Sequence, residues 1–480
     1  MNFAGRRVAI AGLGVSGMAA AAALAPLGAR LALADSDRSR RDRAAQVAAQ
    51  SDAVVLDPAN VAVDELDLVV ASPGWPPTEP LLVRARAAGV PVISEVELAW
   101  RLRANADADW LTVTGTDGKT TTVKMTRAIL QADGRRAQAA GNVGAPLVTA
   151  VLDPTVDVFV VELSSFQLHH TTSPRPRAAA LLNVAQDHLD WHGSFEAYKQ
   201  AKGRVFAGVR DALIFNADDP VSRELAAAAK AGQGTLKVGF TLRAPEAGEV
   251  GLVGSLLVDR AFSNPHEADG RPLADLADLP QLPGPAPRVP PHLAADALAA
   301  AALALAGGAS PRGVREGLRA FQLDAHRLEH VDVLAGVRYV DDSKATNAHA
   351  AGAALMGFAA GSVVWIAGGL AKGAQFQDLV ASRADRLKAA VLIGVDRAPL
   401  ARALAPCAVP VVEIPDGPAV MSRAVAAATR LAAPGDCVLL APASASMDQF
   451  DSYAQRGAAF REAVAELRRS ASCDEKEARP

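Results

Sequence analysis

A glycine-rich stretch early in the chain contains the residue types that hold nucleotide phosphates. Its residues are Thr114, Gly115, Thr116, Asp117, Gly118, Lys119, Thr120 and Thr121. The stretch follows an apolar, strand-like run, and the backbone N–H groups of such a loop attract an anion. Lys119 can reach the β- and γ-phosphates, and the Thr120 hydroxyl can bind Mg²⁺. Because Gly-Lys-Thr follows the first glycine at a shorter spacing than usual, we interpret the stretch as a variant phosphate loop.

Carboxylates and histidines that could bind a metal ion follow two further apolar runs. Glu162 ends the run 158–161, at the edge of a sheet where Mg²⁺ ligands are expected beside a nucleotide crevice. Asp187, His188, Asp190 and His192 come soon after the run 178–183. These residue types also allow zinc, but the neighbouring phosphate loop favours Mg²⁺.

A second glycine motif lies near the N-terminus. Gly12, Gly14 and Gly17 follow the apolar run 7–11, and Asp35 ends the next one. This pattern resembles a dinucleotide fingerprint and, taken alone, suggests an NAD-dependent dehydrogenase. A nucleotide-linked substrate in the first domain and ATP in the second would account for both glycine loops.

Strand-like runs alternate with helical stretches through most of the chain, and they must position these residues. We expect strands at 7–11, 30–34, 66–71, 110–114, 156–161, 178–183, 363–367, 390–393 and 437–440, and helices at 18–27 and 294–305. This alternation predicts parallel sheets. The sequence therefore predicts an α/β protein of three consecutive domains.

The expected domains are a Rossmann-like domain, a central P-loop-type ATPase domain and a C-terminal Rossmann-like α/β domain. They cover residues 1–106, 107–322 and 323–470. The Pro- and Gly-rich segment 263–291 is interpreted as a loop or partly disordered insertion in the central domain. Residues 471–480 are charged, and we expect a flexible tail there.

The composition excludes several classes of protein. Hydrophobic residues make up 50% of the 480 residues, which excludes disorder over most of the chain. A net charge of -3 argues against a nucleic-acid binder. The three cysteines suit a reducing compartment, and no apolar run is long enough to cross a membrane. Glycines interrupt the Ala-rich stretch near the start, which argues against a signal peptide. We expect a cytoplasmic monomer.

The motifs together resemble the Mur ligase family of ATP-dependent amide-bond ligases, in order and over nearly the whole chain. The resemblance rests on 12–17, 72–74, 114–122, 141–144, 162–168, 187–190, 201–202, 326–329, 341–347, 368–372 and 445–450. The stretches ELSSFQL at 162–168 and DDSKATN at 341–347 resemble the family member that adds D-glutamate. The resemblance implies ATP-dependent ligation of D-glutamate to UDP-N-acetylmuramoyl-L-alanine through an acyl phosphate, in cytoplasmic peptidoglycan precursor synthesis.

The resemblance also implies roles for individual residues. The UDP-substrate would be bound by Val15, Ser16, Asp35, Ser36, Ser72, Pro73, Gly74, Asn142 and Gln167. ATP would be bound by Gly115, Thr116, Asp117, Gly118, Lys119, Thr120, Thr121, Arg327 and Asp342. D-Glutamate would be bound by Lys344, Thr346, Lys372, Ser446, Met447 and Tyr453. Two Mg²⁺ ions would be held by Thr120, Glu162, His188 and Lys202, the last as a carbamate. The catalytic residues would be Lys119, Glu162, His188, Lys202 and Arg327.

Some positions depart from the family pattern and keep other interpretations open. His292-Leu293-Ala294-Ala295-Asp296 stands where His-Asn-x-x-Asn is usual, and Asp117 replaces an asparagine. Because Leu293 cannot hydrogen-bond adenine, we expect weaker ATP affinity. The alternatives are a ligase for another amino acid or a folylpolyglutamate synthase, an NAD-dependent oxidoreductase, and an inactive paralogue that binds UDP-sugars.

Overall fold

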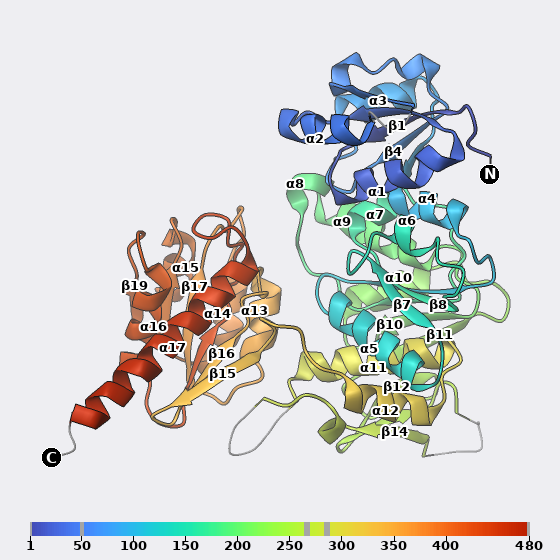
Figure 1. The fold of residues 1–480 in the computed structure, drawn as a ribbon. Coiled ribbons are helices and arrows are strands. Elements are labelled where there is room, and N and C mark those ends of the chain that lie inside the picture. The colour runs from blue at the N-terminus through green and yellow to red at the C-terminus, as the bar shows by residue number, and fades with distance from the viewer. Residues whose placement is uncertain (1, 49–51, 264–268, 283–288, 478–480) are drawn as a thin grey trace. The chain divides into compact units, whose positions relative to one another are not determined.

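The computed structural model describes the chain except residues 1, 49–51, 264–268, 283–288 and 478–480, and the side chains of Val47, Asp190 and 471–477. The chain forms two compact units (Figure 1). Residues 1–278 and 295–321 make up the first unit, and residues 279–294 and 322–480 the second. Two α/β sheets belong to the first unit and one to the second.

The N-terminal sheet has five parallel strands in the order β3-β2-β1-β4-β5. The strands are β1 (Arg7–Ala11), β2 (Arg30–Ala34), β3 (Ala53–Leu56), β4 (Leu68–Ala71) and β5 (Val92–Ser94). The helices are α1 (Val15–Leu24), α2 (Arg38–Ala48), α3 (Pro80–Ala87) and α4 (Glu95–Leu102). The strand order reverses between β1 and β4, and ligands of such sheets bind beside this point.

The central sheet has nine strands in the order β14-β13-β12-β11-β10-β9-β6-β8-β7. They are β6 (Asp109–Thr114), β7 (Ala137–Gly141), β8 (Val158–Glu162), β9 (Ala178–Leu181), β10 (Ala212–Asn216), β11 (Leu236–Phe240), β12 (Glu249–Val253), β13 (Leu256–Asp259) and β14 (Arg271–Asp275). The helices are α5 (Lys119–Ala132), α6 (Leu147–Ala150), α7 (Ser165–His169), α8 (Leu189–His192), α9 (Phe195–Gly203), α10 (Pro220–Ala228), α11 (Pro291–Ala306) and α12 (Pro311–Ala320). Every residue of β8 is buried, which is typical of a parallel strand covered on both faces.

The prediction of a loop over the whole segment 263–291 is wrong, because strand β14 lies within it. β14 pairs antiparallel with β13, and Leu273 and Ala274 are buried there. These two apolar side chains hold the strand on the core despite the prolines around it. Residues 264–268 and 283–288 of the segment lie outside the described residues.

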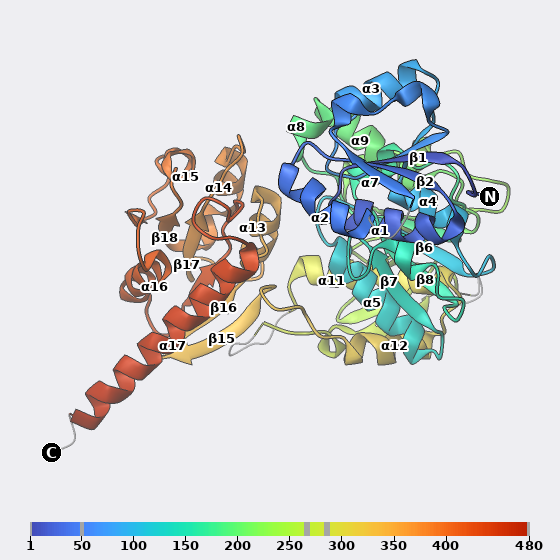
Figure 2. The ribbon, with the colours of Figure 1, turned by 45° about the horizontal axis from the view of Figure 1, so that its top comes forward.

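The C-terminal sheet has six strands in the order β15-β16-β20-β17-β18-β19, parallel except for the β15–β16 pair. They are β15 (Glu329–Leu334), β16 (Val337–Asp341), β17 (Val363–Gly368), β18 (Leu387–Ile393), β19 (Val411–Glu413) and β20 (Cys437–Leu440). The helices are α13 (Ala348–Leu355), α14 (Gln377–Arg383), α15 (Ala398–Leu404), α16 (Val420–Leu431) and α17 (Tyr453–Glu477). Helix α17 packs along β15 and β16 (Figure 2) and runs to Glu477, into the segment where we expect a tail.

The Ala-rich helix α11 contains the expected helix 294–305 and is largely buried. Its residues Ala297–Ala304 have no exposed surface.

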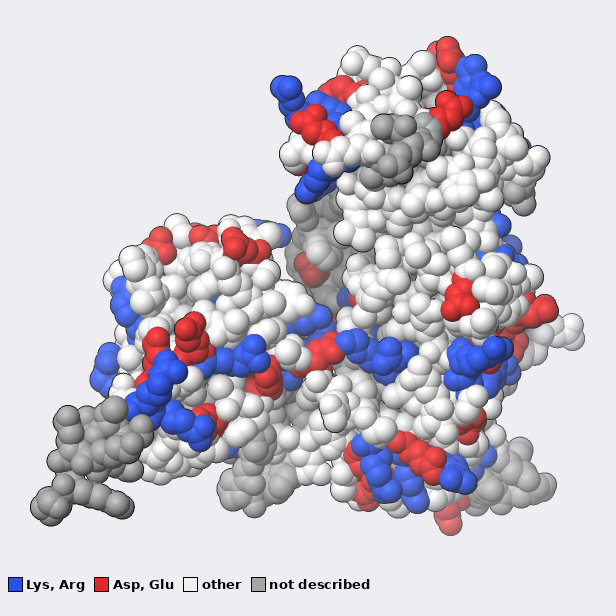
Figure 3. Space-filling view, viewed as in Figure 1, with Lys and Arg blue, Asp and Glu red and all other residues white. Residues whose placement is uncertain are grey.

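Among the described residues, no helix is both long and apolar enough to span a membrane. On the face shown in Figure 3, basic and acidic residues are interspersed.

Candidate active site

The phosphate loop joins β6 to α5 in the middle of the central sheet. Lys119 Nζ donates to the main-chain oxygens of Gly115 at 2.9 Å and Thr116 at 2.7 Å, so its ammonium group lies inside the loop. Asn183 Oδ1 accepts the main-chain N–H of Asp117 at 2.9 Å. These contacts hold the loop in one shape at the start of a helix, where an anion is stabilised.

Asp296 of α11 lies against the end of this loop. Gly118 has a φ of +81°, and a Cβ built on it would lie 2.2 Å from Asp296 Oδ1. Only glycine therefore fits at this position, for both its backbone angle and its space. The carboxyl group that replaces the usual asparagine is thus a buried neighbour of the phosphate loop.

Glu162 ends β8, the strand next to β6. Its Oε2 accepts a hydrogen bond from Thr120 Oγ1 at 2.8 Å, and its Oε1 accepts one from Asn142 Nδ2 at 3.0 Å. The residue is 2% exposed. The loop hydroxyl and the strand carboxylate therefore lie together, and both supply the oxygen atoms that Mg²⁺ prefers.

Lys202 lies at the back of the phosphate loop, near the end of α9. Its Nζ donates to the main-chain oxygen of Gly115 at 2.6 Å and lies 4.7 Å from the ring centre of Tyr198. Burial, and then the Lys119 ammonium group, holds the pKa of the Lys202 amine well below its usual range. The side chain is 98% covered by protein, so a surface role is excluded.

An aromatic and histidine cluster lies beside these groups. The rings of His188 and Phe166 are 4.8 Å apart, and His188 adopts a positive φ of 51° at the start of α8. His192 Nε2 lies 2.9 Å from Ser165 Oγ. The side chain of Asp190 lies outside the described residues. The loop after β9 thus brings His188 to the same edge of the sheet as the phosphate loop.

In the N-terminal sheet, the glycine loop and the loop after β4 are joined at the point where the strand order reverses. Ser72 Oγ donates to the main-chain oxygen of Gly12 at 2.6 Å. A Cβ at Gly17 would lie 1.8 Å from that same oxygen, so α1 can approach the loop only because this residue is glycine. Asp35 accepts the main-chain N–H of Leu13 at 2.7 Å and is 2% exposed.

The other residues expected to bind the UDP-substrate differ in their surroundings. Val15 is 79% exposed at the start of α1, Ser36 and Gly74 are exposed, and Ser16 and Pro73 are half-buried. Gln167 is buried and its Oε1 accepts the Ser164 N–H at 2.9 Å, as part of a capping box on α7. Asn142 contacts Glu162, as described above. The glycine loop, Asp35 and Ser72 therefore lie together, whereas Asn142 and Gln167 are in the central domain.

The residues expected to bind D-glutamate lie on three loops and one helix of the C-terminal unit. Lys344 and Thr346 follow β16, Lys372 follows β17, Ser446 and Met447 follow β20, and Tyr453 begins α17. Because β16, β20 and β17 are neighbouring parallel strands, these loops leave the sheet at one edge. Lys344 Nζ lies 5.3 Å from the Tyr453 ring centre. Ser446 is buried, whereas Lys372 and Met447 are exposed.

Arg327 stands between two residues with positive φ, His326 at 64° and Leu328 at 43°. His326 Nδ1 lies 2.7 Å from Asp341 Oδ2, and Asp342 Oδ1 accepts the Leu328 N–H at 3.1 Å. The Nε atom of Arg327 is buried without a hydrogen-bond partner among the described residues. The residues on both sides of Arg327 are therefore held in place by hydrogen bonds, while the Nε atom of Arg327 makes none among the described residues.

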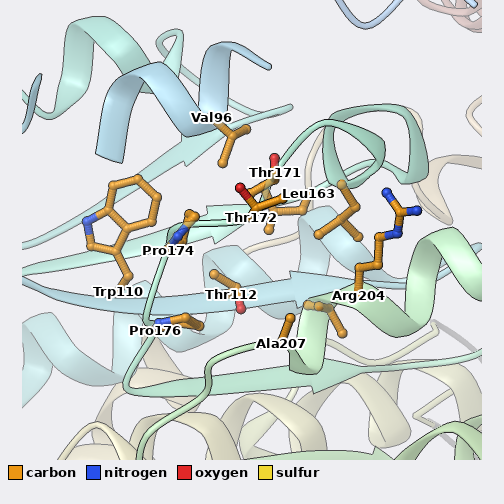
Figure 4. Close-up of a pocket in the computed structure, with 12 residues that line it drawn as sticks. Val96, Trp110, Thr112, Leu163, Thr171, Thr172, Pro174, Pro176, Arg204 and Ala207 are labelled. Carbon is orange, nitrogen blue, oxygen red and sulfur yellow. The ribbon is translucent and has the colours of Figure 1, made fainter. Parts of the chain in front are cut away.

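A small pocket in the first unit lies apart from the phosphate loop (Figure 4). Thr112, Leu163, Thr171 and Arg204 are among its lining residues. The lining is mostly apolar and hydroxyl-bearing, and Arg204 is its one charged side chain. Such a lining does not suit a triphosphate.

Sequence reasoning missed two residues around the phosphate loop, Asn183 and Tyr198, and noted Asp296 only as a departure from the family pattern. Asn183 and Asp296 contact it as described above, and the Tyr198 hydroxyl lies 3.0 Å from Thr116 Oγ1. Burial raises the pKa of that hydroxyl, so it stays protonated. The position of Asn183 at the end of an expected strand could have indicated its role. No feature of the sequence pointed to Tyr198.

Known families match three successive segments of the chain. These are the Mur ligase MurD-like N-terminal domain over 6–94, the Mur ligase middle domain over 113–250 and the Mur ligase glutamate ligase domain over 326–444. The chain is 51% identical over 470 residues to the UDP-N-acetylmuramoylalanine--D-glutamate ligase of Streptomyces avermitilis, which covers 96% of this chain and 98% of that protein. The chain belongs to the Mur ligase family. This confirms the resemblance and replaces the oxidoreductase interpretation of the N-terminal glycines.

A ligase of the same name from Thermobifida fusca is 51% identical over 475 residues, covering 97% of this chain and 100% of that protein. Among solved structures, the UDP-N-acetylmuramate-alanine ligase from Thermotoga maritima has a TM-score of 0.56 at 16% identity, covering 97% of this chain and 99% of that chain. This likeness concerns the fold alone and agrees with the three α/β domains of a Mur ligase.

Proposed function

We propose that this Mur ligase joins D-glutamate to UDP-N-acetylmuramoyl-L-alanine at the expense of ATP, in cytoplasmic peptidoglycan precursor synthesis, and acts as a monomer. One observation carries the proposal: Lys119, Glu162 and Lys202 meet around a single phosphate loop. A phosphate-binding lysine, a carboxylate suited to Mg²⁺ and a buried amine that could become a carbamate would together hold MgATP, from which an acyl phosphate is formed. The names of the relatives supply D-glutamate as the amino acid.

The residues around Glu162 fit Mg²⁺. The Thr120 hydroxyl and the Glu162 carboxylate are 2.8 Å apart, and His188 lies at the same sheet edge. We assign Thr120, Glu162, His188 and carbamylated Lys202 as the residues that would hold two ions. When bound, Mg²⁺ supplies positive charge to the phosphates of ATP.

The environment of Lys202 suits carbamylation. Burial lowers the pKa of its amine, which favours the uncharged form, and the uncharged amine is the form that adds to carbon dioxide. The product carries oxygen atoms, which a bare ammonium group lacks and which Mg²⁺ prefers. This modification would turn a buried lysine into an anionic ligand beside Gly115.

The proposed reaction has two steps. The terminal carboxylate of the UDP-substrate attacks the γ-phosphorus of ATP and forms an acyl phosphate with release of ADP. The D-glutamate amine then attacks the acyl carbon, and the tetrahedral intermediate releases phosphate as the amide forms. Lys119 stabilises charge on the transferring phosphoryl group, and we propose the same role for Arg327.

Each substrate has its own proposed site. The glycine loop, Asp35 and Ser36 would bind the uridine end. The diphosphate and sugar would lie along Ser72, Pro73, Gly74, Asn142 and Gln167. Lys344, Thr346, Lys372, Ser446, Met447 and Tyr453 would bind D-glutamate, whose two carboxylates match the two lysines. We propose Asp342 as a further contact of ATP.

Phosphate release tests the proposal. Purified protein with MgATP should release phosphate only when UDP-N-acetylmuramoyl-L-alanine and D-glutamate are both present. Binding of the UDP-substrate without any phosphate release would favour the inactive paralogue. The altered segment 292–296 is the sequence feature that suggests this alternative.

A further inference from the structure

Arg456, on the first turn of α17, is an arginine with no exposed surface. Its Nε donates to Ser343 Oγ at 3.1 Å, its Nη2 to the Ser343 main-chain oxygen at 2.9 Å and its Nη1 to the Ser444 main-chain oxygen at 3.1 Å. All of these acceptors are uncharged. A buried guanidinium group held by neutral oxygens is costly, so its retention calls for a role beyond packing.

The guanidinium group lies where three loops of the C-terminal sheet meet. Ser343 follows β16 and Ser444 follows β20. Gly369 follows β17, and a Cβ built on it would lie 3.2 Å from Arg456 Nη1 and 2.2 Å from the Ala445 oxygen. The third loop can therefore close on the arginine only because it carries a glycine there.

Each of these loops continues directly into residues proposed above for D-glutamate. Lys344 follows Ser343, Ser446 comes shortly after Ser444, and Lys372 shortly after Gly369. Tyr453 stands one turn before Arg456, and its main-chain oxygen accepts a hydrogen bond from Ser343 Oγ at 2.8 Å. We propose that Arg456 is a positioning residue that fixes the three loops in the arrangement that binds D-glutamate. This inference rests on the proposed function.

The chemistry of the side chain explains why arginine is used. A guanidinium group is planar and has donors pointing in several fixed directions, so it can reach acceptors on separate loops at once. A lysine ammonium group at the same place cannot span them. Burial lowers the pKa of Arg456 to about 10, against the opposing effect of the nearby Asp448 and Asp341 carboxylates, so the group stays charged at neutral pH.

Kinetics with each substrate varied in turn test the role. Arg456→Lys and Arg456→Met should each raise the KM for D-glutamate by roughly tenfold or more, because hydrogen bonds from a charged donor are lost. The KM for the UDP-substrate should stay within about twofold, because the proposed site of that substrate contains none of these loops. Arg383→Met is the matched control: this arginine also donates to a main-chain oxygen of the C-terminal unit, that of Gly352 at 3.1 Å.

A milder variant keeps the test decisive if Arg456→Met does not fold. Ser343→Ala removes one acceptor and leaves the two main-chain acceptors, so the KM for D-glutamate should rise about threefold to tenfold. An unchanged KM for D-glutamate in Arg456→Lys and Ser343→Ala, or an equal rise for all three substrates, would overturn the inference. A wild-type protein that does not use D-glutamate would instead overturn the proposed function.

Discussion

The side-chain amine of Lys202 lies 2.6 Å from the main-chain oxygen of Gly115, so a residue of α9 reaches the first glycine of the phosphate loop. The contact ties the loop to the element that follows the His188 segment. Burial and the Lys119 ammonium group hold the pKa of this amine well below its usual range. The proposed nucleotide and metal sites of the central domain therefore share one buried side chain.

Lys202→Arg should lower the rate of ligation by roughly 10–100-fold or more, because arginine keeps a cation but cannot form a carbamate. Lys199→Arg is the control, since Lys199 lies on the same helix and pairs with Glu196 and Glu224. Isotope-labelled bicarbonate should give a carbamate signal by NMR in the wild type and in Lys199→Arg. Full activity of Lys202→Arg would contradict the carbamate.

Gly17→Ala should weaken binding of the UDP-substrate and lower stability by about 1–3 kcal/mol, the usual cost of overpacking. Its new Cβ would lie 1.8 Å from the Gly12 oxygen. Gly14→Ala is the control on the same loop, because a Cβ there meets nothing within 4 Å. Calorimetric titration and thermal unfolding would measure both effects, and ATP affinity should not change. Equal behaviour of the two variants would show that the close approach of α1 is unimportant.

Gly118→Ala should abolish most ATP binding, because alanine is strained at a φ of +81° by about 1–2 kcal/mol and its Cβ collides with Asp296. The double variant Gly118→Ala, Asp296→Ala removes the collision but keeps the backbone strain at residue 118, so it should restore ATP binding only in part. Equilibrium binding of a fluorescent ATP analogue would measure this. If the single variant Gly118→Ala bound ATP as tightly as the wild type, the phosphate loop would have to adopt another shape.

Glu95 should make stability depend on pH. Burial raises its pKa to about 7 from an ordinary 4.5, while its Oε1 accepts the Val148 N–H at 2.6 Å. The folded chain therefore binds a proton that the unfolded chain releases between these pH values, and stability falls as pH rises through this window. Glu95→Gln should become more stable than the wild type as pH rises, by up to about 3 kcal/mol above pH 7.

Glu97, on the same helix, provides a control of opposite sign. Despite burial, hydrogen bonds from Ser173, Thr172 and Arg101 hold its pKa below the usual range. Its carboxylate therefore stabilises the fold above the unfolded pKa, and this stability is lost as pH falls. Glu97→Gln should be most destabilised at neutral pH. Parallel pH profiles of thermal unfolding for the two variants would contradict both assignments.

Local patterns in the sequence predict the phosphate loop and nine of the twenty strands that the structure describes. Strands β1, β2 and β20 have the expected bounds, because short apolar runs with clear ends define them. Strand β14 is among the strands that were not expected, because Pro272 interrupts its short run and only Leu273 and Ala274 face the core. Its stability depends on pairing with β13, which no local pattern reveals.

The site is predicted less completely, since several of its contacts join distant parts of the chain. The contact of Asp296 with Gly118 and the burial of Arg456 depend on helix packing. Asn142, expected near the sugar, donates to Glu162 in the structure. A motif indicates which residues matter, but the partner of each one is set by the fold.

Product analysis with competing amino acids tests the central claim most directly. The protein, MgATP and UDP-N-acetylmuramoyl-L-alanine would be incubated with D-glutamate, L-glutamate or another amino acid, and the UDP-linked products separated by chromatography. The account predicts one new product, formed with D-glutamate and absent with L-glutamate. A product formed with a different amino acid, or none with D-glutamate under conditions where both nucleotides bind, would contradict it.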